Sequence, residues 1–252
     1  MSLKNLHGVL FGLFLTFQAA ASPLLAIDLA EQEGMLSQRI VKAYCQIAVK
    51  IAPELAQHLL AQSIRDFEDN LKLLEKTVGA PGARSPLTDL RSAWEVMLPG
   101  APDEFTPSGA EQLDRRAEAV LQAAGRLNAE LQDRAPAVIN RWGNTAARQR
   151  MLSQRLGKAY MLRQLGLDSA ATRQELESAS HEFSGALAGL QKRTENSPAV
   201  RRALDDLATQ WEWLQEALAV EGASDYRLIV AEGSDVILEL ADKVTTLYSN
   251  GQ

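Results

Sequence analysis

The sequence has very few of the residues on which stapled or metal-bound folds depend. Cys45 is the only cysteine among 252 residues, which excludes an intramolecular disulfide, a zinc knuckle and a c-type haem site. Aromatic residues make up 6% of the chain, and this scarcity favours helices over sheets. Basic residues are outnumbered, with 26 Lys and Arg against 32 Asp and Glu, and the net charge of −6 argues against a general nucleic-acid binder.

The sequence also lacks the short motifs of common enzyme classes. It contains no HExxH, no GxSxG and no phosphate-binding glycine loop. His58 and His181 stand at unmatched places, and the paired Glu-x-x-His motifs of a di-iron bundle are missing. We therefore expect a protein that is not an enzyme and holds neither a cofactor nor a metal.

Long apolar runs are absent, and one short run lies near the start. Residues 8–17 are uncharged and apolar, follow Lys4 and precede the small residues Ala19-Ala20-Ala21, a pattern typical of a secretory signal. The run is well short of the roughly 20 residues that cross a bilayer. The sequence predicts a cleaved signal peptide over residues 1–21 and export to the periplasm.

What the sequence does contain is an internal repeat. Residues 35–44 (MLSQRIVKAY) recur as residues 151–160 (MLSQRLGKAY), with eight of ten positions identical at an offset of 116. Phe67 matches Phe183 at the same offset, and Trp94 matches Trp211 after one inserted residue. We predict a duplication of two modules, over residues 22–135 and 136–252.

Each module has the hydrophobic spacing of helices. Leu36, Ile40, Ala43 and Ile47 form one stripe, and similar stripes cover residues 60–74 and 113–131. Pro and Gly interrupt the pattern at residue 53, over 79–86 and over 99–107, and leave a short helical segment at 87–97. The predicted fold is all-α, with two tandem four-helix bundles.

The repeated segment resembles the opening helix of PilJ/NarX-type sensory domains, the periplasmic four-helix bundles of chemoreceptors and nitrate-sensing kinases. Residues 146–155 (AARQRMLSQR) depart from the family signature only at Ala147, whereas residues 30–39 lack both leading arginines. In the family's nitrate sensors, the arginine directly before the Met holds the anion. The resemblance therefore implies a role for Arg150, whose counterpart in the first copy is Gly34. Because the chain shows no kinase or methyl-accepting segment, we expect a membrane receptor or sensor kinase as its partner.

The residues themselves predict a second seam on the motif helix of the second copy. Opposite its core stripe, small residues surround one arginine: Gly143, Ala146, Arg150, Ser153 and Gly157. An arginine in a close helix seam needs an anion, and its planar fork of donors suits nitrate, nitrite or a carboxylate. The predicted ligand-binding residues are Arg150, Ser153, Arg148, Arg155 and Gly34. The alternative is a structural ion pair between Arg150 and Glu31 or Glu33.

The first copy has small or apolar residues at the equivalent seam positions, namely Ile27, Ala30, Gly34, Ser37 and Val41. We expect the two seams to face each other as an internal pseudo-dimer in which Gly34 leaves space for Arg150. One arginine in place of two predicts weak anion binding, or a homodimer that brings two Arg150 residues together. The functional prediction is an exported sensory protein that recognises a small oxyanion. The alternative is a helical protein-interaction module without a small ligand.

Overall fold

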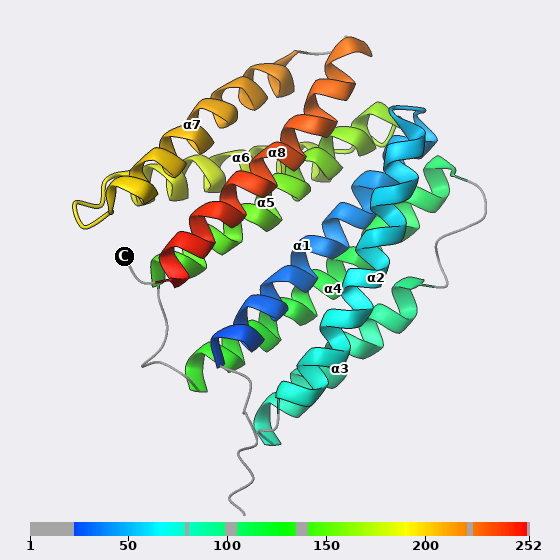
Figure 1. Ribbon diagram of the computed structural model, residues 1–252. Helices are drawn as coiled ribbons and strands as arrows, with labels where there is room; N and C mark the ends of the chain where they lie inside the picture. The colour runs from blue at the N-terminus through cyan, green and yellow to red at the C-terminus, as the bar shows by residue number, and fades with distance from the viewer. Residues whose placement is uncertain (1–22, 79–80, 99–104, 135–140, 221–223, 251–252) are drawn as a thin grey trace, which may run out of the picture.

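The computed structural model describes residues 23–78, 81–98, 105–134, 141–220 and 224–250. These residues form eight α-helices and no strand, which confirms the all-α prediction (Figure 1). The helices are α1 (Pro23–Ala48), α2 (Pro53–Thr77), α3 (Pro81–Met97), α4 (Pro107–Arg134), α5 (Arg141–Gln164), α6 (Ala170–Gln191), α7 (Pro198–Ala219) and α8 (Ser224–Ser249). The predicted signal peptide and the predicted module boundary at residues 135–136 lie outside the described residues.

Proline marks where many of these helices begin. Helices α1, α2, α3, α4 and α7 all start at a proline, where the missing backbone N–H is not needed and the fixed φ suits a helix. In α6 and α7, the side chains of Ser169 and Ser197 cap the first turn by accepting backbone N–H groups. Helix α3 corrects one prediction. It begins at Pro81 and continues through Pro86, whereas the sequence predicted a break over residues 79–86.

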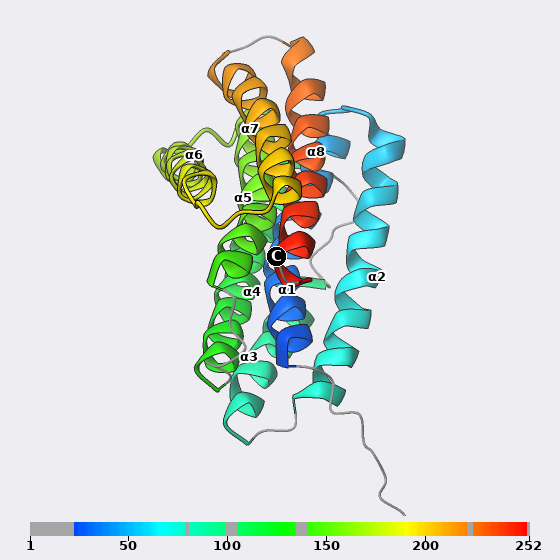
Figure 2. The ribbon, with the colours of Figure 1, turned by 60° about the vertical axis from the view of Figure 1, so that its left-hand side comes forward.

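The helices pack in the same order in the two halves of the chain. In the first half α1 packs on α2 and α4, and α3 packs on α4. In the second half α5 packs on α6 and α8, and α7 packs on α8. Figure 2 shows the result, a long molecule in which most helices run along one axis, whereas α6 is tilted away from it and is seen nearly end-on. The duplication itself stays a prediction that rests on the sequence repeat.

Helices α1 and α5 join the halves. They pack side by side and run parallel, since Asp28 approaches Arg150 near their starts and Lys42 approaches Gly157 further along (Figure 1). Helix α1 is buried on nearly all sides because α2, α4 and α5 all pack against it. The two motif helices therefore lie at the centre of the molecule.

Matched aromatic pairs fill the two cores. Phe67 stacks on Trp94 with ring centroids 3.8 Å apart, and Phe183 lies against Trp211 at 4.4 Å. Both tryptophans are buried and belong to the cores of the two halves. Within the described ranges, no helix combines the length and apolarity that a membrane crossing requires.

Cys45 gives a first testable prediction about this core. Its side chain is fully buried, and burial raises the pKa of the thiol above its ordinary value. Because the thiolate is the reactive form, we expect a thiol reagent to leave Cys45 unmodified in the native protein and to label it fully in denaturant. Stoichiometric labelling within minutes under native conditions would contradict this packing.

Candidate functional site

The repeated motif places matched basic residues on both sides of the α1–α5 contact. Lys42 of α1 reaches into the other half and donates to Asp235 Oδ1 of α8, 2.7 Å away. Lys158, the matching residue of α5, donates to Glu118 Oε1 of α4 at 2.9 Å. Both lysine side chains are completely buried. Each half therefore supplies a buried ammonium group to the last helix of the other half.

The two lysines differ in how many carboxylates meet them. Lys158 also contacts Asp114 at 2.6 Å and Glu175 at 2.8 Å. Burial acts to lower the pKa of Lys158, but its three carboxylates outweigh burial and raise it. For Lys42 the stronger influence is burial, which Asp235 offsets only in part, so the pKa of Lys42 is lowered.

Arg150 is fully engaged by carboxylates of the protein itself. Its Nη1 donates to Asp242 Oδ1 of α8 at 2.7 Å, and its Nη2 donates to Asp28 Oδ1 of α1 at 2.5 Å. The guanidinium is 4% exposed. These partners replace Glu31 and Glu33, the carboxylates that the sequence suggested for an ion pair. An anion at Arg150 would have to displace both aspartates.

Ser153 and Gly34, two other residues predicted in the seam, are not placed to contact an anion at Arg150. The Ser153 hydroxyl donates to the carbonyl of Arg150, one turn back on its own helix. Gly34 faces α4, since a Cβ at this position would lie 3.0 Å from Cδ1 of Leu121. The expectation that Gly34 makes room for Arg150 is therefore wrong. The space beside Gly34 belongs to a different part of the molecule.

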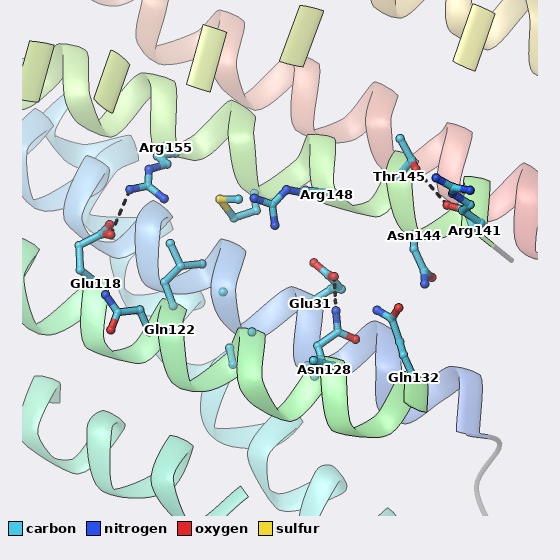
Figure 3. A pocket seen from close by; sticks show the side chains of 17 residues that line it. Glu31, Glu118, Gln122, Asn128, Gln132, Arg141, Asn144, Thr145, Arg148 and Arg155 are labelled. Carbon is cyan, nitrogen blue, oxygen red and sulfur yellow. Dashed lines mark hydrogen bonds and ion pairs between the residues drawn. The ribbon is translucent and has the colours of Figure 1, made fainter. Parts of the chain in front are cut away.

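That space is a groove of about 690 Å³ between α1, α4 and α5 (Figure 3). Small and apolar residues form part of its lining, among them Gly34, Ala124 and Gly125. Polar and charged side chains from the three helices surround them: Glu31, Glu118, Gln122, Asn128, Gln132, Arg141, Asn144, Arg148 and Arg155. In Figure 3, Arg148 and Arg155 extend from α5 into the space above α4, and Glu31 and Asn128 meet across the gap between α1 and α4.

Most charges of the groove already have partners within the protein. Arg155 contacts Glu118 at 3.1 Å and Glu175 at 2.8 Å. Arg148 donates through Nε to Glu182. Arg141 lies over the ring of Trp142, 5.9 Å from its centroid.

Glu31 differs from these residues because it is a partly buried carboxylate that makes no ion pair among the described residues. Its Oε1 accepts a hydrogen bond from Asn128 Nδ2. Burial raises the pKa of Glu31, and the nearby Arg148 and Arg150 counteract part of that rise.

The sequence anticipated part of this lining. Gly34, Arg148 and Arg155 were predicted as ligand-binding residues and do line the groove, whereas Arg150 and Ser153 do not. Arg141 was missed, although Arg141, Arg148 and Arg155 are spaced by seven and therefore share one face of α5. Asn128 and Gln132 carry no sequence signal, since amides on an amphipathic helix resemble any solvated face. In the described part of the chain, no group of His, Cys, Asp and Glu is arranged to hold a metal ion.

Comparison with known proteins matches part of the chain, and one wall of this groove, to a family. Residues 143–235, from α5 into α8, match the family model described as "PilJ: Type IV pili methyl-accepting chemotaxis transducer N-term". This segment is a PilJ-like domain. No curated protein and no solved structure matched the chain.

The PilJ-like match contains the second copy of the motif and one wall of the groove. Arg148 and Arg155 lie within it, while Gly34 and Asn128 lie before it. The family's description names the N-terminal part of a chemotaxis transducer, which is a signal-transduction protein. The PilJ-like domain therefore has a sensory role in signalling. The first copy of the motif lies outside the matched residues, so a second PilJ-like domain remains a prediction.

Proposed function

We propose that this protein is an exported, non-enzymatic sensory protein that binds a ligand with an anionic group in the α1–α4–α5 groove. The observation that carries the proposal is the row of Arg141, Arg148 and Arg155 along a groove of about 690 Å³. We further propose that the protein acts in the periplasm and passes its signal to a membrane receptor or a sensor kinase. A homodimer would place two such grooves in one assembly.

The charges of the groove indicate that the ligand contacts α5 through an anionic group. Three guanidinium groups and two carboxylates line it, and Arg155 shares its charge with Glu118 and Glu175. Arg141 and Arg148 then form the basic end, next to the amide of Asn144. Arginine and amide donors at one end of a groove suit a carboxylate or another oxyanion.

The groove is a better location for this ligand than Arg150. Arg150 is buried and holds two aspartates, so binding an anion there costs two existing ion pairs. In the groove, Arg148 contacts Glu182 only through Nε and at an exposed position, so an anion there does not have to displace a buried ion pair. Nitrate or nitrite, the oxyanions that the family resemblance suggests, would occupy only a small part of it. The ligand we propose is therefore larger than these ions and presents its oxyanion to Arg141 and Arg148.

A binding experiment tests the proposal. We expect acetate or succinate to raise the melting temperature more than nitrate or nitrite do, each compared with chloride at equal concentration. Replacing Arg141 and Arg148 by Gln should lower the affinity for that ligand by roughly tenfold to a hundredfold, because a lost charge-assisted hydrogen bond is worth about 1.5–3 kcal/mol. Calorimetry on the purified full-length protein measures both effects.

Arg126→Gln is the matched control for this experiment. Arg126 is exposed on α4 and lies outside the groove, so its replacement removes one positive charge, against two in the double variant, and should leave binding unchanged. Equal weakening by Arg126→Gln would show that only net charge is sensed. If the double variant still binds the anion, the anion binds elsewhere. Arg150→Ala then tests Arg150, the residue that the family resemblance implies.

The alternative function is a helical protein-interaction module, and one observation favours it. Trp213 of α7 and Val96 of α3 stand at matched positions of the repeat and are 63% and 61% exposed. Exposed tryptophan is often found where proteins contact each other. If no anion stabilises the protein and Trp213→Ala abolishes its association with a receptor, this function replaces the first.

A further inference from the structure

Two acceptors on the groove wall, the carboxylate of Glu31 and the Oδ1 of Asn128, have few donors within the protein. Glu31 accepts a hydrogen bond from Asn128 through Oε1, and none of the ion pairs among the described residues involves Glu31. The Oδ1 of Asn128, which is 7% exposed, is buried with no hydrogen-bond partner. A partly buried carboxylate and a buried amide oxygen are both unfavourable unless donors reach them. Their position on the groove wall points to a donor that a ligand brings.

The opposite side of the α1–α5 pair shows what kind of donor the same architecture accepts. There, the guanidinium of Arg150 lies between Asp28 and Asp242. By sequence match, the corresponding residues on the groove side are Gly34, Asn144 and Gly125. All three line the groove, and a Cβ added at Gly125 would meet no atom within 4 Å. The side that contains Arg150 is thus closed by an internal cation, and the other side is open.

We infer that the ligand of the groove is a zwitterion of the amino-acid class, a claim that rests on the proposed function. Its ammonium or guanidinium group binds Glu31 and the Oδ1 of Asn128, and its carboxylate binds Arg148 and Arg141. In this arrangement the ligand supplies the cation that Arg150 supplies on the other side.

The groove carries charges of both signs, which favours a zwitterion over a dicarboxylate or a simple amine. A ligand with carboxylates at both ends meets Glu31 or Glu118, whereas a simple amine meets three arginines without a compensating anion. A zwitterion satisfies both signs at once. The small residues Gly34, Ala124 and Gly125 leave room for its side chain.

The test uses matched ligands and the full-length protein. Each of the twenty standard L-amino acids is titrated singly by calorimetry, and the tightest is then compared with its deaminated acid and its decarboxylated amine. We expect the amino acid to bind at least tenfold more tightly than either analogue. Glu31→Gln should reduce its affinity to that of the deaminated acid, whereas Arg148→Gln should weaken both.

A second variant keeps the proposal testable if Glu31→Gln disturbs folding. Gly125→Leu places a side chain into open groove space and should abolish binding while circular dichroism stays unchanged. The zwitterion is ruled out, and the proposed function kept, if the deaminated acid binds as tightly as the amino acid and depends on Arg148. If neither the amino acids nor their acids bind, both proposals fail.

Discussion

Replacing Lys158 by Met is expected to lower the free energy of unfolding by about 3–5 kcal/mol, because removing one partner of a buried ion pair leaves charge without compensation. The Lys158 side chain is completely buried, and its ammonium lies within 2.6–2.9 Å of Asp114, Glu118 and Glu175. Glu118 and Glu175 would keep Arg155 as a partner, whereas Asp114 would lose its ammonium group beside two other carboxylates. Urea denaturation followed by circular dichroism measures the loss.

The matched residue Lys42 provides the control for Lys158. It is equally buried but meets one carboxylate, Asp235, and burial already disfavours its charged form. Lys42→Met should therefore destabilise the protein clearly less than Lys158→Met. Equal losses for the two variants would mean that the carboxylates around Lys158 contribute nothing beyond burial.

Replacing Glu33 by Gln is expected to stabilise the protein, and more so as the pH rises. Glu33 is completely buried, both of its carboxylate oxygens lack a hydrogen-bond partner, and burial raises its pKa well above 4.5. An acid whose pKa is higher in the folded state opposes folding above its unfolded pKa. Between the two pKa values, each pH unit costs about 1.4 kcal/mol. Gln, the residue at the matching position 149, removes that cost.

The measurement is the urea midpoint of wild-type and Glu33→Gln protein from pH 4 to pH 8. The difference should be small near pH 4.5 and grow to about 1 kcal/mol or more as the pH rises. Glu177→Gln serves as the control, because Glu177 is exposed on α6. A difference that does not change with pH would show that Glu33 stays ionised in contact with water.

The helices were predictable because their signals are local. Apolar residues spaced three and four apart, together with prolines at helix starts, identify each helix from a short stretch of sequence. The same locality explains the error at α3, where Gly79 to Pro86 reads as a break. Pro86 falls in the second turn of a helix that starts at Pro81, where a proline removes the bond to a single carbonyl.

The site was only partly predictable because it depends on which neighbour each helix face meets. The spacing of α1 shows that Gly34 lies in a seam, but α1 contacts α2, α4 and α5, and the spacing does not say which of them Gly34 faces. Likewise, Arg150 requires a carboxylate by simple electrostatics. Its partners Asp28 and Asp242 lie 122 and 92 positions away, beyond the reach of a local pattern.

The exchange of buried lysines between the halves fixes how they can move. Lys42 and Lys158 lie on parallel neighbouring helices, and each is bound to the last helix of the opposite half. Sliding α1 along α5 would pull Lys42 from Asp235 and Lys158 from Glu118 at the same time, while Lys158 would keep Glu175 of its own half. These two ion pairs between the halves therefore fix the register of α1 against α5. A shift along the helix axis must break both of them or neither.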